Sequence, residues 1–326
     1  MPNPLHRIVK KARAAGAIAL ALRAAKRRCR RGEADALIAG IVDFEHKDHG
    51  VELGEWRYEH VVSEKSGAPY YYYHLPAERE GAPSLVMIHG MFLDARNFIR
   101  FVPLARHFEL IAVELPHQSP FYNGRIADFT DLLQDFLDTL GLARIHLCGI
   151  SLGGMIAMAY AGGSPRTPID RLYLISTDAA KDMAALEKQR RNVGRAIKAV
   201  QDREDLTICL VDELRRRRLK DADPHMREVL RLFSLKHPAF YRQVLHAGKN
   251  IETLLPIHRI AVPTLHIHGD ADSTLPLKSA RHLTAHIPGA RLEVIAGGEH
   301  DIAYTHAGEV LSLIEQDYLS GKPLAL

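Results

Sequence analysis

The sequence predicts an α/β protein whose core is a doubly wound, mostly parallel sheet of eight strands with an inserted helical cap. Short apolar segments alternate with segments of helical period along most of the chain. This alternation is typical of a parallel sheet with helices on both faces. One long interval has no strand-like segment, which indicates helices inserted between two strands.

The first two strands are expected at 55–62 and 69–76, on either side of the turn SEKSGA, where they form a hairpin at one edge of the sheet. The later strands are short, apolar and bounded by turn residues, as strands buried on both faces should be. They are expected at 84–90, 109–116, 144–150, 171–176, 264–270 and 291–297. Helical segments such as 127–141 lie between them.

The interval from 178 to 255 contains charged stretches of helical period instead of strands. An ordinary crossover between parallel strands needs only one helix, so several helices are predicted to form a separate subdomain here. The expected division of the chain is a basic N-terminal arm at 1–50, an α/β core at 51–177 and 256–326, and a helical cap at 178–255.

The composition is that of a globular protein: 326 residues, 47% hydrophobic and 25% charged. This length allows one large core with an insertion. Cys29, Cys148 and Cys209 lie far apart and have neither the spacing of a disulfide framework nor that of a zinc site. We therefore expect a reducing, cytoplasmic location and a protein that requires neither a metal nor an organic cofactor.

The net charge of +4 comes from the start of the chain. Residues 1–31 contain ten Lys and Arg and no Asp or Glu. The rest of the chain has 33 basic against 39 acidic residues. The body is therefore acidic and is not expected to bind nucleic acid.

Residues 1–31 allow two interpretations. The apolar stretch AAGAIALAL is too short to cross a membrane, and the basic run RAAKRRCRR that follows it is unlike the end of a signal peptide. A basic, weakly amphipathic helix of this kind can lie on an anionic membrane surface. That interpretation places the protein peripherally on the inner face of a membrane, and the other makes the segment a solvated tail.

The stretch LCGISLGGM at 147–155 contains the pattern Gly149-x-Ser151-x-Gly153. A predicted strand precedes it and a helix of small and apolar residues follows it. A strand, a sharp turn and a helix are the context that a nucleophile elbow requires. The pattern also occurs by chance, so a structural turn is the alternative for these residues taken alone.

A nucleophilic serine needs a base and an orienting acid. His300 follows the last predicted strand, whereas His146, His268 and His306 are expected to be structural or exposed. The acid should follow the preceding strand, in the sequence LHIHGDADSTLP.

Two aspartates of that loop are candidates. Asp272 lies further into the loop and can reach His300, whereas Asp270 is expected to hold the turn. Asp178, after the strand at 171–176, is the second choice because that strand end faces the same edge of the sheet.

Two backbone N–H groups are needed to hold the oxyanion of a tetrahedral intermediate. One is expected from Leu152, the residue after the nucleophile, at the start of a helix where N–H groups are free. The other is expected from the loop in which His89 and Gly90 turn the chain and Met91 follows.

The order of these segments resembles the α/β-hydrolase family: strand–HG, strand–ELP, strand–GISLGG, strand–GDAD and strand–GGEH. The resemblance covers about residues 55–320 and is closest to capped serine esterases and lipases, including monoacylglycerol-lipase-like members. It implies Ser151 as nucleophile, His300 as base and Asp272 as acid. It also implies the N–H groups of Met91 and Leu152 as the oxyanion hole, and residues 178–255 as a cap over the pocket.

Three residues depart from the pattern of the family. Glu114 and His117 stand in ELPHQSP, where many relatives have Asp-x-Pro-Gly-x-Gly, and Glu299 precedes the base where a small residue is commoner. The first two predict a local loop shape that differs from that of these relatives, and a carboxylate beside the base is expected to raise the pKa of the base. The predicted triad is unaffected.

The predicted activity is hydrolysis of a carboxylic ester with a medium-length or lipid-like acyl chain, through an acyl-enzyme on Ser151. The expected partner is a small-molecule acyl ester. One alternative is a carbon–carbon bond hydrolase that uses the same triad on a diketone. The other is a non-catalytic ligand-binding protein of the same fold, against which the complete triad argues.

Overall fold

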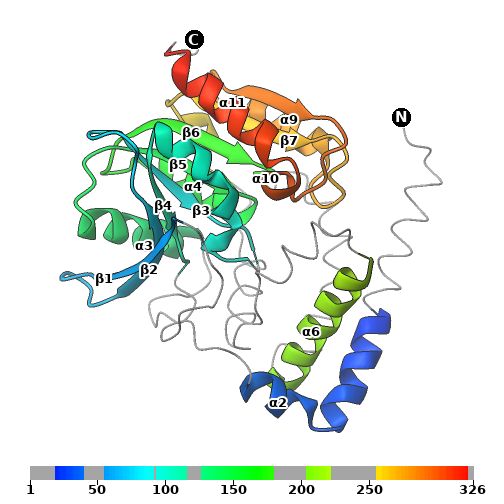
Figure 1. Ribbon diagram of the computed structural model, residues 1–326. Coiled ribbons are helices and arrows are strands. Elements are labelled where there is room, and N and C mark those ends of the chain that lie inside the picture. The colour runs from blue at the N-terminus through cyan, green and yellow to red at the C-terminus, as the bar shows by residue number, and fades with distance from the viewer. Residues whose placement is uncertain are drawn as a thin grey trace. The chain divides into compact units, whose positions relative to one another are not determined.

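The computed structural model describes residues 19–39, 55–91, 93–115, 126–179, 203–221 and 255–321. The chain divides into two compact units. Met1–Val51 and Asp182–Leu245 form the first, and Glu52–Lys181 and His246–Leu326 form the second, which is the core unit. Figure 1 shows the elements of both units.

The core unit is built on one sheet of eight strands in the order β1-β2-β4-β3-β5-β6-β7-β8. β1 pairs with β2 and β2 with β4 in antiparallel fashion, and all other neighbours are parallel. This confirms the predicted eight-stranded, mostly parallel sheet with a hairpin at one edge. The strands are β1 Arg57–Val62, β2 Pro69–Leu75, β3 Ser84–Ile88, β4 Glu109–Val113, β5 Ile145–Ile150, β6 Ile169–Ile175, β7 Thr264–Gly269 and β8 Arg291–Ile295.

Every residue of β3, β5 and β7 is buried, as expected for strands covered on both faces. On one face, the 3₁₀ helix η1 (Ala95–Arg106) and helices α10 (Ile302–Thr305) and α11 (Ala307–Leu319) share a core with the strands. Helices α3 (Ile126–Thr139), α4 (Leu152–Gly162) and α9 (Leu277–Ala285) also pack against the sheet or against one another (Figure 1). A short 3₁₀ helix, η2 (Ile257–Arg259), precedes β7.

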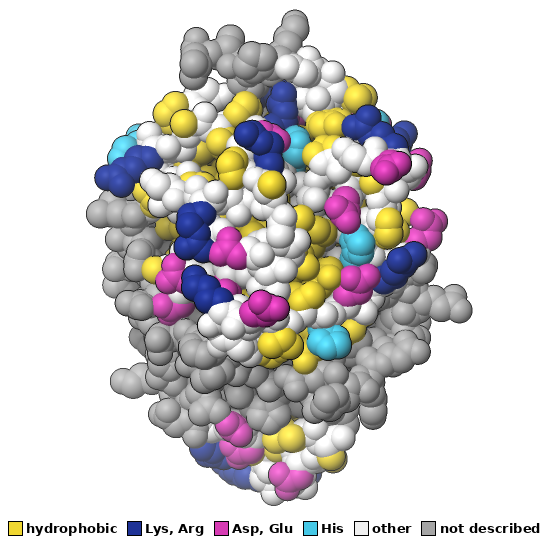
Figure 2. Space-filling model, turned by 90° about the vertical axis from the view of Figure 1, so that its left-hand side faces the viewer, with side chains coloured by type: hydrophobic (Ala, Val, Ile, Leu, Met, Phe, Trp, Pro, Cys, Tyr) yellow, Lys and Arg dark blue, Asp and Glu magenta, His cyan; other side chains and the backbone are white. Residues whose placement is uncertain are grey.

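The surface of the core unit carries charges of both signs. Figure 2 shows acidic and basic side chains mixed over the described part of the face on which the β1–β2 hairpin lies, with apolar side chains between them. The described part of this face shows no large patch of one sign of the kind that attracts a nucleic acid.

The first unit contains a helix at 19–30, helix α2 (Glu33–Ala39) and helix α6 (Glu204–Asp221). The Cys29 thiol donates a hydrogen bond to Asp205 over 2.6 Å, and Arg28 forms ion pairs with Glu33 at 2.7 Å and Asp212 at 2.8 Å. Described parts of the basic arm and of the region expected to form the cap therefore belong to one compact unit. Among the described residues, no helix is both long and apolar enough to span a membrane.

The helix at 19–30 has two different faces. Its buried residues are Ala21, Ala25 and Arg28, which follow the spacing of one helix face. The other cations of the helix are exposed and lie on the opposite side: Arg23, Lys26, Arg27 and Arg30. Among the described cations of this helix, Arg28 is the one that is buried within the unit.

Candidate active site

Ser151 lies at the sharp turn between β5 and α4. Its backbone has φ 51° and ψ −114°, a left-handed region that side chains other than glycine rarely adopt. Such a conformation costs about 1–3 kcal/mol and persists only where the surroundings hold it. The Ser151 N–H donates to the Ile175 carbonyl over 3.0 Å, and the Met155 N–H donates to the Ser151 carbonyl over 3.2 Å.

The glycines on either side of Ser151 are required by the close approach of β3, β5 and α4. A Cβ atom at Gly149 would overlap the carbonyl of Gly153, and one at Gly153 would overlap the carbonyl of Ile88. The pattern Gly-x-Ser-x-Gly is therefore a packing requirement of this turn, which explains why it is informative here.

His300 stands between Ser151 and Asp272. Its Nε2 lies 3.1 Å from Ser151 Oγ, and its Nδ1 lies 2.8 Å from Asp272 Oδ2. The three side chains come from loops after β5, β7 and β8, at the carboxyl ends of parallel strands. The structure thus brings together the serine, histidine and aspartate that the sequence analysis singled out.

The Asp272 carboxylate is fully buried and well satisfied. Its Oδ1 accepts the N–H groups of Thr274 over 2.8 Å and Leu275 over 2.7 Å, while Oδ2 accepts from His300. Hydrogen bonds to both oxygens hold a carboxylate in one orientation. Asp272 can therefore orient the His300 ring and balance a positive charge on it.

The loops that carry Asp272 and His300 are joined by direct hydrogen bonds. Gly297 N–H donates to Asp270 Oδ1 over 2.7 Å, Ala271 N–H to the Gly298 carbonyl over 2.9 Å, and Ser273 N–H to Glu299 Oε2 over 3.0 Å. Asp270 holds the turn, as expected. Glu299, which departs from the family pattern, serves as a second link between the two loops.

Asp178 lies after β6 but is not the partner of the histidine. Its side chain is buried, and its Oδ1 accepts the N–H of Ala179 over 2.7 Å. Burial raises the pKa of Asp178 above the usual value. The geometry thus favours Asp272 over Asp178 as the acid.

One expected oxyanion donor, Leu152, follows Ser151 directly, and the loop of the other approaches Ser151 at Gly90. Leu152 is the first residue of α4, so its N–H has no partner one turn earlier in the helix. Gly90 packs against the nucleophile, because a Cβ atom built on it would lie 3.4 Å from Ser151 Cβ. Met91 follows in the same loop, and Phe92 lies outside the described residues.

A buried cluster of charged side chains supports the loop that contains His89 and Met91, and the sequence analysis did not predict it. Asp94 binds the Arg96 guanidinium through both carboxylate oxygens, at 3.0 and 2.7 Å, and accepts the Arg96 N–H at the start of η1. Glu114 Oε1 accepts the Ala95 N–H over 3.0 Å, and His89 Nε2 accepts the Leu115 N–H over 3.2 Å. Glu114, noted as a departure, thus anchors the loop of the expected oxyanion hole, whereas His117 lies outside the described residues.

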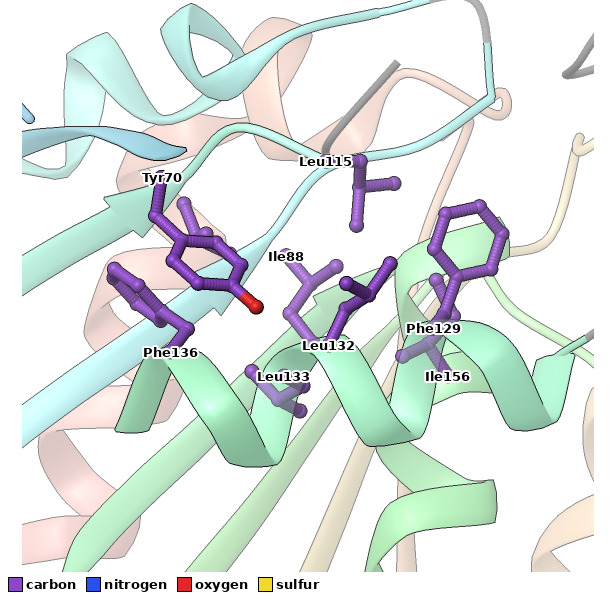
Figure 3. A pocket seen from close by; sticks show the side chains of 9 residues that line it. Tyr70, Ile88, Leu115, Phe129, Leu132, Leu133, Phe136 and Ile156 are labelled. Atoms are coloured by element: carbon purple, nitrogen blue, oxygen red, sulfur yellow. The ribbon is translucent and has the colours of Figure 1, made fainter. Parts of the chain in front are cut away.

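An apolar pocket lies between α3 and the ends of β3 and β4 (Figure 3). Side chains of α3 point toward Ile88 and Leu115, and the Tyr70 hydroxyl at one end donates to Asp135 over 2.8 Å. Ile88 immediately precedes the His89–Gly90 loop. The pocket is lined by Tyr70, Ile88, Val113, Leu115, Phe129, Leu132, Leu133, Phe136 and Ile156.

No group of three or more His, Cys, Asp or Glu side chains in the described ranges has the arrangement of a metal site.

Known proteins resemble this chain over most of the core unit. The family described as having the alpha/beta hydrolase fold matches residues 83–307. A hydrolase from Pseudomonas aeruginosa PA01 is similar in structure, with a TM-score of 0.67 and 22% identity, over 82% of this chain and 99% of its own. This likeness shows the fold.

Curated relatives agree with that family. Monoacylglycerol lipase abhd6-B of Xenopus laevis is 23% identical over 263 residues, which are 73% of this chain and 75% of the relative. A putative non-heme chloroperoxidase of Synechocystis is 54% identical, but only over 57 residues, 17% of this chain. The chain spans 21% of that protein and 45% of another relative, the biotin biosynthesis bifunctional protein BioHC of Teredinibacter turnerae.

Proposed function

Because the chain belongs to the α/β-hydrolase fold family, we propose that it is a serine hydrolase that cleaves carboxylic esters through an acyl-enzyme on Ser151. The observation that carries the proposal is the position of His300, with one ring nitrogen 3.1 Å from Ser151 Oγ and the other 2.8 Å from Asp272. A nucleophile, a base and an orienting acid in this order are the arrangement that activates a serine.

In the proposed first step, His300 Nε2 takes the proton of Ser151 Oγ while Oγ attacks the ester carbonyl carbon. The backbone N–H groups of Met91 and Leu152 hold the oxyanion that forms. The tetrahedral intermediate then collapses, the bond to the alcohol oxygen breaks, and the imidazolium of His300 protonates the leaving alcohol.

The second step releases the acyl group. His300 takes a proton from a water molecule, whose oxygen attacks the acyl-enzyme carbonyl. Collapse of the second tetrahedral intermediate returns the proton to Ser151 Oγ and frees the carboxylic acid. In both steps Asp272 keeps Nδ1–H of His300 toward itself, which leaves Nε2 free to accept the proton.

The likeness to known proteins supports an apolar acyl group in the substrate. The chain's relatives include a monoacylglycerol lipase, and a thermophilic esterase from Thermogutta terrifontis has a similar fold with a TM-score of 0.65. We therefore propose a medium-chain or lipid-like acyl ester.

The substrate class is tested with p-nitrophenyl esters of increasing acyl length beside vinylogous diketones. We expect Ser151-dependent turnover of the esters, with kcat/KM highest at medium length. Turnover of the diketones alone would indicate a carbon–carbon bond hydrolase instead. No turnover of either, combined with ligand binding, would indicate a binding protein.

We also propose that the exposed cations of the helix at 19–30 dock the protein on an anionic membrane surface. Each Lys or Arg near such a surface contributes about 1 kcal/mol. Replacing all four with Gln is therefore expected to weaken binding to anionic vesicles by up to about 10³-fold at low salt. The four are Arg23, Lys26, Arg27 and Arg30.

Vesicle sedimentation measures this effect, with neutral lecithin vesicles as a second arm. The matched control replaces four exposed cations of the core unit with Gln: Arg57, Lys65, Arg259 and Arg281. The control should retain binding, and the wild type should be released as salt shortens the Debye length from about 10 Å at 0.1 M to about 3 Å at 1 M. Equal binding by the two variants would show that the helix at 19–30 is solvated and has no role in membrane binding.

A further inference from the structure

Strand β7 carries two histidines on one face, two residues apart. His266 and His268 are both fully buried, and their ring centroids lie 5.3 Å apart. An ionisable side chain in such a place is costly unless it is neutral and hydrogen-bonded. The proposed mechanism uses neither ring, so the reason for burying each histidine must lie in its own contacts.

His268 contacts the loop that carries the acid. Its Nε2 lies 2.9 Å from the Leu275 carbonyl and 3.5 Å from Asp272 Oδ2. A carbonyl oxygen only accepts hydrogen bonds, so Nε2 must carry the proton. Burial lowers the pKa of His268, against the opposing effects of the Leu275 carbonyl and of Asp272, so the ring is neutral and donates from Nε2.

Leu275 is thereby held from two sides. Its N–H donates to Asp272 Oδ1 over 2.7 Å, while its carbonyl accepts from His268. The same residue connects the buried ring of β7 to the carboxylate that orients His300. If the ring is removed, Leu275 loses its anchor on the strand and the hydrogen bond that fixes Asp272 Oδ1 loses its support.

The structure assigns His268 as a positioning residue of the proposed hydrolytic reaction: through Leu275 it fixes the orientation of the Asp272 carboxylate toward His300. This inference rests on the proposed function. His268 touches neither Ser151 Oγ nor the place of the ester carbonyl in the described contacts, so its effect on catalysis passes through the acid.

Other titratable groups act on the pKa of His268 in both directions: the carboxylates of Asp272 and Asp178 raise it, whereas burial and the His300 ring lower it. Asp272 and Asp178 interact with the His268 ring electrostatically, as do the rings of His266 and His300. Burial raises the pKa of Asp178.

His266 provides a matched control on the same strand and face. Its Nδ1 lies 2.9 Å from the Thr284 hydroxyl of α9, and the Thr284 hydroxyl in turn donates to the Ala280 carbonyl. Its ring is as buried as that of His268 and packs against it, but its side-chain hydrogen bond is to Thr284 of α9 and not to the loop of the acid. Replacing it should affect stability without affecting the triad.

The first test compares three variants by kcat, KM and thermal unfolding. His268→Asn carries a short amide that cannot reach Leu275, whereas His268→Gln places an N–H donor about where Nε2 stood. A misplacement of about 1 Å in a catalytic group costs about 10²-fold in rate, so His268→Asn should lose about that factor in kcat with KM nearly unchanged. His268→Gln should recover most of the loss, and His266→Asn should lower the unfolding temperature but leave kcat near that of the wild type.

The second test uses NMR spectra instead of kinetics. In ¹⁵N-labelled wild-type protein, the ring nitrogen shifts of His268 should show a neutral ring with the proton on Nε2. The downfield proton resonance of His300 Nδ1–H should be present in the wild type and in His268→Gln, and shifted or lost in His268→Asn. These spectra remain informative if the enzyme turns over no ester, because they report the geometry and not the reaction.

Three results would overturn the inference. They are a proton on Nδ1 of His268, a folded His268→Asn variant with wild-type kcat, and an equal loss of kcat in His266→Asn. Failure of the proposed function looks different: the wild type would then show no Ser151-dependent turnover, while the His268 tautomer and the His300 resonance would be as stated.

Discussion

Ser151→Ala is expected to lower kcat for ester hydrolysis by a factor on the order of 10⁶, as where a serine, histidine and aspartate act as one unit. The substitution removes the Oγ that lies 3.1 Å from His300 Nε2. It leaves the buried partners of the turn in place, so the fold should persist. Steady-state turnover of a p-nitrophenyl ester, with thermal unfolding as a check of folding, measures the effect.

Ser164→Ala is a matched control for this variant. Ser164 also has a positive φ, 65°, but it is exposed and has no part in the triad. The same chemical change should therefore leave kcat unaltered there. A folded Ser151→Ala protein with near-normal turnover would show that the nucleophile lies elsewhere.

Asp272→Asn is expected to lower kcat by roughly 10⁴-fold, because an amide in this place favours the wrong tautomer of the histidine. The Asp272 side chain is fully buried and bonds His300 Nδ1 at 2.8 Å. The amide NH₂ facing Nδ1 would donate to it and move the ring proton to Nε2, which could then no longer accept from Ser151. Kinetics of the variant beside the wild type measure this loss.

Two other aspartates serve as controls for Asp272→Asn. Asp178→Asn should cost far less, because Asp272 and not Asp178 bonds His300 Nδ1, and an amide oxygen at 178 can still accept the N–H of Ala179. Asp270→Asn should also cost far less, because an amide oxygen can still accept the N–H of Gly297. A larger loss at Asp178 than at Asp272 would transfer the role of the acid to the loop after β6.

The sheet and the position of the site were predictable because their causes are local in sequence. Buried strands are continuous apolar segments, and the turn at Ser151 needs Gly149 and Gly153 to avoid contact with neighbouring backbone. The order of the loops then places His300 and Asp272 at the same edge of the sheet. Each of these features depends on a short stretch of chain and on the topology of a parallel sheet.

The hydrogen bonds that hold the loops of the candidate site in place were not predictable, because they join residues from different elements of the fold. Glu114 accepts the N–H of Ala95, a contact that depends on how β4 and η1 lie together. His268 was expected to be structural or exposed, and its fully buried contact with Leu275 depends on the shape of the loop after β7. Burial of a polar group and the identity of its partner are properties of the folded chain.

The contacts of the basic arm were likewise not predictable from the sequence. Its charge and its helical period are visible in the sequence, but the ion pair between Arg28 and Asp212 of α6 is not. This ion pair distinguishes Arg28, which packs within the first unit, from the four cations of the same helix that face outward. The roles of the cap and of the arm remain predictions.

The central claim is that Ser151 is an activated nucleophile, and labelling with a fluorophosphonate probe followed by peptide mapping tests it most directly. The probe reacts with a serine whose oxygen is activated by a base. The predicted result is one modified residue, Ser151, with labelling absent in Ser151→Ala, strongly slowed in Asp272→Asn and unchanged in Ser164→Ala. Labelling of a different residue, or no labelling of a protein that hydrolyses esters, would contradict the account.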